Sequence, residues 1–265
     1  MTAHEPIQIL QRAKGEVLVT LDHAARLQRL RQEGSAKAIL PGGGDVPEVV
    51  FLNTSGGLTA GDRLRFALDL QGSRAVATTQ TAERAYRAEG AMARMDVQLS
   101  VGAGGWLDWL PQETILFDGA ALDRRTVIDL APGAGCLALE AVVLGRAAMG
   151  ETVRRLRFRD RREIRRVGAP VWIDPLALDE RSLQSGPAGL GQARAFASIV
   201  MTGEVPLAPL RAVLDEPGVE AAASAFAGRT VLRLLSPDGW PLRRQIARAL
   251  HILRDGRPLP RVWQL

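Results

Sequence analysis

The chain has 265 residues, of which 46% are apolar and 24% are charged, so it can bury a sizeable core and is not a disordered tail. Its 34 basic residues exceed its 29 acidic residues by only five, which indicates a modest positive charge. The lone cysteine, Cys136, excludes an intramolecular disulfide and the usual thiolate cage of structural zinc. No run of 18 uncharged apolar residues predicts a membrane span, and residues 1–11 carry His4 and Glu5 where a secretory signal needs an apolar core. We therefore expect a cytoplasmic protein outside the membrane, built as a single domain over residues 1–265.

The first two thirds of the chain predict a mainly β fold. Short runs rich in valine, leucine, isoleucine and phenylalanine alternate there with glycine and proline, a pattern of many short strands. The clearest runs are residues 16–21, 49–53, 63–70, 94–101 and 137–144. In 63–70 the leucines and Phe66 share one parity while Arg63 and Arg65 share the other. This alternation predicts a strand with one buried face and one exposed face.

A run of arginines follows at residues 154–166, with eight arginines against Asp160 and Glu163. Within it, Arg155, Arg157 and Arg159 share one parity and the apolar residues share the other. The run therefore predicts the exposed, basic face of a strand that leads into a hairpin.

Helical patterns come late in the chain. Residues 206–216 have leucines at three- and four-residue spacing, and Gly218 follows as a stop signal. Residues 241–254 carry a longer apolar stripe, with Asp238 and Pro241 at its start and Gly256 after its end. We predict two helices near the C-terminus.

The sequence offers no recognisable catalytic residues. The three histidines are scattered without metal-ligand spacing, and no serine lies in a G-x-S-x-G turn. Cys136 lies in an apolar run and is interpreted as a small core residue. The glycine-rich segments 41–44 and 55–62 lack the lysine of a phosphate-binding loop, so they are interpreted as tight turns. We expect no catalytic group and no tightly bound cofactor.

Four carboxylates stand in apolar or glycine-rich surroundings: Asp62, Glu83, Asp108 and Glu140. Glu140 interrupts the apolar run 136–144, where an unpaired carboxylate would be costly. Its partner could be one of the many arginines, or water and a passing cation in an internal channel. Both alternatives remain open at this point.

Five segments resemble the urease accessory protein UreD family, also called UreH. They are residues 56–64 (GGLTAGDRL), 78–87 (TTQTAERAYR), 107–120 (LDWLPQETILFDGA), 144–151 (LGRAAMGE) and 260–263 (PRVW). They occur in the family's order from about residue 53 to the end of the chain.

The resemblance implies a mainly β protein whose many short strands wind into an irregular β-helix-like array, with two helices near the C-terminus. It also implies a nickel-delivery scaffold that binds UreF, through it the GTPase UreG, and the urease apoprotein. GTP would belong to the partner GTPase, and a homodimer within the complex is compatible with this role. In the family, nickel is thought to move through an internal tunnel. Asp62 and Glu140 match acidic tunnel positions, Glu83 matches a polar one, and Glu180 is a fourth, less securely aligned position.

Two other functions fit parts of the sequence. The arginine run 154–166 and the basic C-terminal region suit a nucleic-acid-binding β protein, although few aromatic residues are available for base stacking. An enzyme could use Glu140 and Asp62 as an acid and base pair. We expect a protein-binding scaffold, with no nucleic-acid partner.

Overall fold

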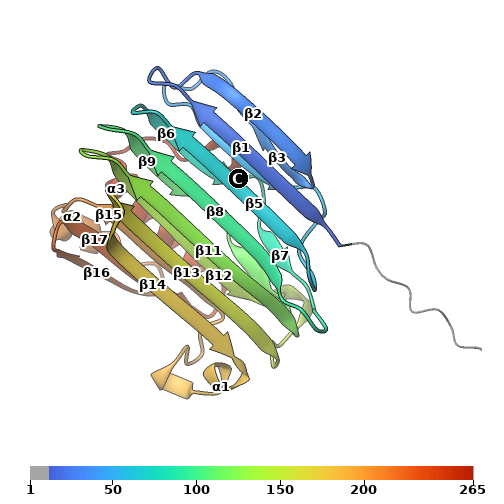
Figure 1. The fold of residues 1–265 in the computed structure, drawn as a ribbon. Coiled ribbons are helices and arrows are strands. Elements are labelled where there is room, and N and C mark those ends of the chain that lie inside the picture. The colour runs from blue at the N-terminus through green and yellow to red at the C-terminus, as the bar shows by residue number, and fades with distance from the viewer. Residues whose placement is uncertain (1–11, 265) are drawn as a thin grey trace, which may run out of the picture.

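The computed structural model describes residues 12–264, and the expectation about residues 1–11 lies outside this part. The described chain forms three layers: a seven-stranded front sheet, a ten-stranded back sheet, and two of its three helices behind the back sheet (Figure 1). The strong alternation of apolar and polar residues explains this layering, because each strand must bury one face.

The front sheet has the strand order β14-β13-β11-β8-β5-β1-β2. Its strands are β1 (Lys14–Leu21), β2 (Leu27–Gly34), β5 (Arg63–Leu70), β8 (Ala93–Val101), β11 (Ala120–Leu130), β13 (Leu156–Arg166) and β14 (Ala169–Asp179). The strands β1, β5, β8, β11 and β13 are parallel, and β2 and β14 are antiparallel at the two edges.

The back sheet has the order β16-β17-β15-β12-β9-β6-β4-β3, with β10 beside β12 and β7 beside β10. Its strands are β3 (Ala36–Ile39), β4 (Glu48–Asn53), β6 (Arg74–Thr79), β7 (Glu83–Ala85), β9 (Trp106–Leu110), β10 (Thr114–Leu116), β12 (Gly135–Leu144), β15 (Ala195–Thr202), β16 (Glu220–Phe226) and β17 (Arg229–Ser236).

From β4 to β13 the chain passes back and forth between the two sheets, so that each sheet has a parallel centre. This winding is that of a flattened, irregular β-helix. The prediction of a mainly β protein with many short strands is confirmed.

Two apolar cores hold the layers together. Phe51 and Phe66 stack between the sheets with ring centroids 5.0 Å apart, and Trp109 lies edge-on to Phe51. Behind the back sheet, Leu242 and Ile246 of α3 belong to the second core. Strand β12 has core on both sides, which explains why its sequence is an almost unbroken apolar run.

The helices are α1 (Glu180–Leu183), α2 (Leu207–Ala212) and α3 (Gly239–Leu253). Helix α3 agrees with the predicted 241–254, and the Asp238 side chain caps it by accepting from the Trp240 amide at 2.8 Å. The prediction for 206–216 was wrong in length, since α2 has only six residues. Pro217 follows closely and disfavours helical backbone at Glu216, whose amide instead donates to Gln245 of α3. The longest helix has 15 residues, and in residues 12–264 none has the length and apolar character of a membrane crossing.

The hairpin predicted for the arginine run is confirmed. Strands β13 and β14 pair antiparallel, and Arg157, Arg159 and Arg161 are exposed on the outer face of the front sheet. Arg162, which belongs to the other parity, points inward.

The turn before β5 depends on Gly57. Its φ is +146°, and a Cβ there would meet the Tyr86 ring and lie 2.7 Å from the Arg84 carbonyl oxygen. We expect Gly57→Ala to lower the free energy of unfolding by about 2–3 kcal/mol, measured by urea unfolding. Gly56→Ala is the matched control, because Gly56 also has a positive φ but no atom within 4 Å of the added Cβ. It should cost only about 1 kcal/mol, and equal losses for the two variants would contradict the steric argument.

Candidate functional site

A line of charged side chains lies between the two sheets and reaches the surface at one end. It contains three carboxylates and three arginines, Glu140, Arg124, Asp160, Arg162, Asp174 and Arg233, and is called the interior ion cluster below. The front sheet supplies Arg124, Asp160, Arg162 and Asp174, and the back sheet supplies Glu140 and Arg233. Strand parity turns each of these residues inward, and the winding of the chain brings the two sheets face to face.

Arg124 is the centre of the cluster and is 3% exposed. Its Nε and Nη2 donate to the two oxygens of Asp160 at 3.0 and 2.7 Å, and its Nη1 lies 2.8 Å from Glu140 Oε2. Nη1 also donates to Thr114 Oγ1 at 2.9 Å. Burial by itself lowers the pKa of Arg124, but Asp160 and Glu140 more than reverse this, so its pKa lies above the usual range. Arg124 is therefore a fixed cation that neutralises two buried carboxylates.

Glu140 is 6% exposed, and three groups contact its carboxylate. Besides Arg124, the Trp109 indole N–H donates to Oε1 at 3.1 Å and the Thr126 hydroxyl donates at 3.2 Å. Burial raises the pKa of Glu140 and Arg124 opposes that shift, while Asp160 adds to it. Of the two alternatives for Glu140, the structure shows the arginine partner.

The cluster continues from Asp160 toward the surface. Arg162 bridges Asp160 and Asp174, and Arg233 makes two hydrogen bonds of 2.7 Å to the oxygens of Asp174. Ser198 also donates to Asp174 at 3.3 Å. Burial raises the pKa of Asp174, but these donors, Arg233 first, hold it below its ordinary value. The Arg233 side chain is 49% exposed, so the cluster ends at solvent.

One small cavity adjoins the cluster, and a second lies beside Glu83. The first, of about 20 Å³, is lined by Glu140, Arg162, Asp174 and Ser198 together with Trp109 and Thr126, among others. The Nε of Arg162 is 3.3 Å from Asp160 but has no hydrogen-bond partner. A space of this size and polarity suits one water molecule, which would accept a hydrogen bond from a donor such as Arg162 Nε. The second cavity, of about 40 Å³, is lined by Asn53, Thr79 and Glu83 among others.

Glu83 lies beside the second cavity, at the Arg124 end of the cluster. In the β7–β10 pairing it is the partner of Thr114, which in turn binds Arg124. The Asn53 amide donates to Glu83 Oε1 at 3.1 Å. Burial raises the pKa of Glu83 to about 7, although Asn53, Arg84 and Arg124 each lower it. Glu83 is thus a largely buried acid without a direct ion pair among residues 12–264.

Asp62 has a different environment. It is 4% exposed at the start of β5, where its two carboxylate oxygens accept from the amides of Ala13 and Thr59, each at 2.8 Å. Its own amide donates to the Thr59 carbonyl. Both oxygens are therefore engaged in closing a turn and joining it to the start of β1.

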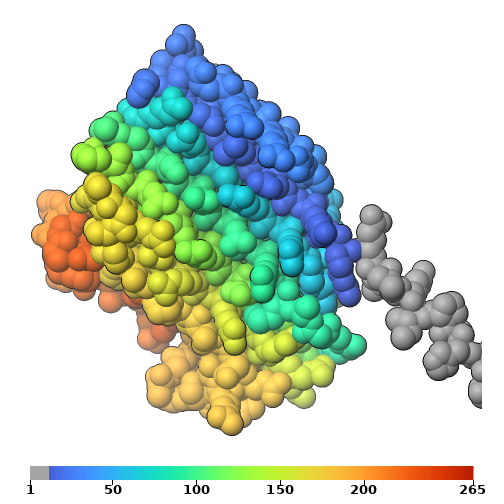
Figure 2. Space-filling view, viewed as in Figure 1, coloured from blue at the N-terminus to red at the C-terminus, as the bar shows by residue number. Residues whose placement is uncertain are grey.

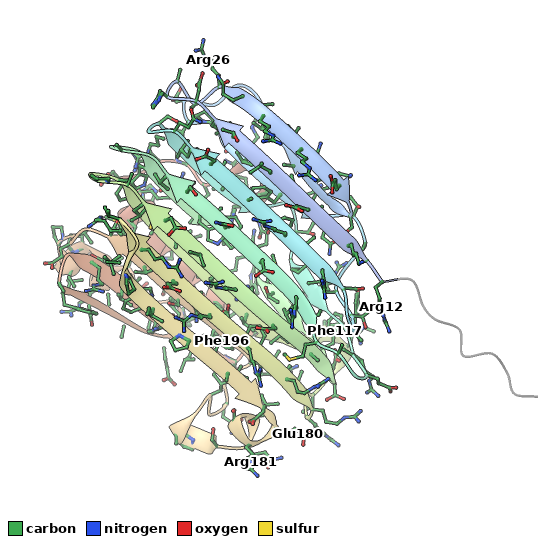
Figure 3. The ribbon with its side chains drawn as sticks, viewed as in Figure 1. Arg12, Arg26, Phe117, Glu180, Arg181 and Phe196 are labelled. Carbon is green, nitrogen blue, oxygen red and sulfur yellow. The ribbon has the colours of Figure 1, made fainter. Side chains whose placement is uncertain are left out.

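Glu180 lies on the surface, as the first residue of α1 (Figure 3). It lines a shallow groove of about 200 Å³ with Arg87, Arg155 and Arg157. The structure thus places Glu140 in the interior ion cluster and Glu83 near its Arg124 end, and it places Asp62 in a turn and Glu180 on the surface.

Within the described part of the chain, no three histidine, cysteine, aspartate or glutamate side chains are grouped so as to hold a metal ion. Cys136 is fully buried, and burial raises the pKa of its thiol to about 12, as befits a core residue. Asp108, the remaining carboxylate noted in the sequence, pairs with Arg254 at 2.9 Å behind the back sheet.

The sequence reasoning missed most of the interior ion cluster. Arg124, Asp160 and Arg162 were not identified as buried, although parity contained the signal. In β13, Asp160 and Arg162 share the parity of Leu156 and Phe158, and in β11 Arg124 shares that of Leu122.

These observations define a class of protein. Asp62 and Glu140, weighed as an acid and base pair, have separate sets of partners and serve a turn and an ion cluster respectively. The described chain is a two-sheet β scaffold whose interior carries a line of paired charges.

Comparison with known proteins identifies the family. The model of the UreD urease accessory protein family matches residues 11–264. Among curated relatives, the urease accessory protein UreD of Cereibacter sphaeroides (strain ATCC 17025) is 62% identical, with 98% of each chain covered. That of Paracoccus denitrificans is 56% identical over 97% of this chain and 94% of its own, and that of Rhizobium leguminosarum bv. trifolii is 44% identical over 96% of each. The chain belongs to the UreD urease accessory protein family and acts in urease maturation, not in catalysis.

Proposed function

We propose that this chain is the nickel-path subunit of a cytoplasmic urease maturation complex. It binds UreF, through it the GTPase UreG, and the urease apoprotein, and it is free to form a homodimer within that complex. Nickel moves through the space between its two sheets toward the urease active site. The family membership supports the role in maturation, and the interior ion cluster supports the path.

The observation that carries this proposal is the line of buried carboxylates between the sheets. Glu83 and Glu140 both lie in the field of Arg124, and Asp160 and Asp174 continue the line to the exposed Arg233. Carboxylate oxygens accept borderline and hard divalent cations, and a site without histidine and cysteine holds such ions weakly. Weak binding is what passage requires, since a tight site would retain the ion.

In the resting chain the guanidinium groups occupy the positions where a passing cation would meet these carboxylates. The cavity of about 20 Å³ at the cluster and the cavity of about 40 Å³ beside Glu83 admit single waters, not an ion with a full hydration shell. Passage therefore requires Arg124 or Arg162 to swing away, and leaving a buried carboxylate without its arginine costs roughly 3–5 kcal/mol. We propose that the partners supply this free energy on assembly, so that the path opens only in the complex. Asp62 and Glu180 lie outside the cluster, and we assign them to the approaches of the path.

Glu140→Gln tests the path. The amide keeps the shape of the side chain and removes its charge, so we expect the complex to assemble while urease activation falls at least about tenfold. The chain would be co-expressed with UreF, UreG and the urease apoprotein, and complex yield, nickel content of urease and urease activity would be measured together.

Asp108→Asn is the matched control, because it also breaks a buried carboxylate–arginine pair, but behind the back sheet. At equal yield of complex it should leave nickel loading unchanged. If both variants lower nickel loading to the same extent, the effect of Glu140→Gln is one of stability, and the interior path is wrong.

A further inference from the structure

The outer face of the front sheet is bare. In Figure 1 no helix or loop lies over it, whereas α3 covers the back sheet from behind, and Figure 2 shows the same face as a broad surface. Parallel sheets normally have both faces covered, so an open face across five parallel strands is unusual. The exposed side chains on this face are mostly charged (Figure 3).

A row of cations crosses this face near the start of the parallel strands. Lys14, Arg63 and Arg94 are register partners on β1, β5 and β8. The row continues with Asp123 on β11 and Arg159 on β13. Lys14, Arg63, Arg94 and Arg159 are called the basic band below.

The fold relieves the charge repulsion of the basic band only in part, because Asp123 faces Arg94 and Arg159 while Lys14, Arg63 and Arg94 face one another. Like charges directly opposite each other on neighbouring strands are destabilising. Within residues 12–264, none of the four cations lies within 4 Å of a carboxylate oxygen, although many other arginines of this chain do. Lys14, Arg63 and Arg94 are therefore adjacent cations that make no ion pair among the described residues, which leaves them available to an acidic partner.

The neighbouring charges indicate which kind of partner binds the basic band. Glu16, Asp96 and Asp123 are interspersed with the cations, and Glu16 pairs with Arg65 at 3.1 Å. These carboxylates would repel a phosphate backbone, while a protein surface carrying both signs, with acids in excess, can match the pattern. The cations are mostly arginine, which is enriched in protein interfaces, and the described outer face offers Ile173 but no row of aromatic rings for bases.

The size of the face also fits a protein. Seven strands at about 4.8 Å spacing and eight residues at about 3.3 Å rise span roughly 900 Å². A stable protein interface buries about 800 Å² on each partner. The face is therefore about large enough for an interface with one partner protein.

We propose that the outer face of the front sheet is a docking surface for an acidic face of a protein in the urease maturation complex, with the basic band as its electrostatic centre. The choice of complex rests on the proposed function, and the docking face itself rests on the band. Arginine-to-acid contacts speed the encounter and fix its register, so binding should weaken as salt rises.

Arg63→Glu tests this assignment with two readouts of opposite sign. It converts the row to strict alternation of charge, from Lys14 to Arg159, so the thermal midpoint of the isolated chain should stay equal or rise. Affinity for purified UreF or urease apoprotein at about 50 mM salt should fall about tenfold for the one that uses this face, and much less at about 300 mM. Arg63→Lys keeps the charge and should bind nearly as the parent does.

Arg181→Glu, an equal charge reversal on α1, is the control and should leave affinity unchanged. Unaltered affinity of Arg63→Glu for every partner would overturn the docking face, while the proposed function would stand as long as the complex still assembles. If the parent chain binds neither protein, the proposed function fails first, and the assignment of partners fails with it. A generic DNA duplex is the third probe: binding to it at about 150 mM salt that Arg63→Glu removes, with protein partners unaffected, shows that the partner class is wrong.

Discussion

Arg124→Met is expected to lower the free energy of unfolding by about 3–5 kcal/mol, a large share of what holds a domain folded. The reason is the position of Arg124, which is 3% exposed and neutralises Glu140 and Asp160 together. Methionine fills much of the space but leaves both carboxylates buried with less compensation. Urea unfolding followed by tryptophan fluorescence would measure the loss, at a pH near 7.

Arg125→Met is the matched control. Arg125 is the next residue of β11 and points to the exposed face of the front sheet, so its loss should change the free energy of unfolding by no more than about 0.5 kcal/mol. A loss for Arg124→Met as small as that of the control would show that the cluster contributes little to stability. In that case the guanidinium would be free to move without help from partners, and the proposed gating by assembly would be unnecessary.

Glu83→Gln should raise the free energy of unfolding above neutral pH, in contrast to the loss expected for Arg124→Met. The Glu83 carboxyl has a pKa raised from 4.5 to about 7 by burial, so the folded chain retains a proton that the unfolded chain releases. Stability therefore falls as pH rises through the window from about 4.5 to about 7, and the full cost, up to about 3 kcal/mol, is present above it. Glutamine is neutral throughout, so the variant should be more stable than the parent at pH 8 by up to about 3 kcal/mol and equal to it near pH 4.5.

The measurement is urea unfolding of both chains at a series of pH values across that window. Glu89→Gln serves as control, because Glu89 is an exposed carboxylate only six positions further along the chain. It should leave the pH dependence of the parent intact. If the fall in stability between pH 4.5 and 7 persists in Glu83→Gln, the titrating group is another one.

Together these two variants show that Arg124 and Glu83 have opposite effects on the stability of the interior. One buried cation stabilises the fold by neutralising two acids, while a neighbouring acid remains costly when it is charged.

Much of the architecture follows from the sequence. The alternation in residues 63–70 gave the inward face of β5 correctly, and the arginine parity gave the outward face of β13. The helix at 239–253 was foreseen from its stripe and its capping aspartate. The length of α2 was overestimated, because the leucine spacing in 206–216 does not show that the helix ends well before Pro217.

The site was less accessible to such reasoning. Glu140 was identified as a buried acid in need of a partner, but parity shows only that a residue points inward, not which residue faces it. That choice depends on how the winding aligns strands from different parts of the chain: Arg233 meets Asp174 from 59 positions away, and Arg124 meets Asp160 from 36. The sequence by itself determined the β class, the family and the inward faces of the strands, since these depend on local alternation and motif. Only the tertiary structure decided which charges neutralise one another, because these pairs depend on the register of neighbouring strands and on how the two sheets stack.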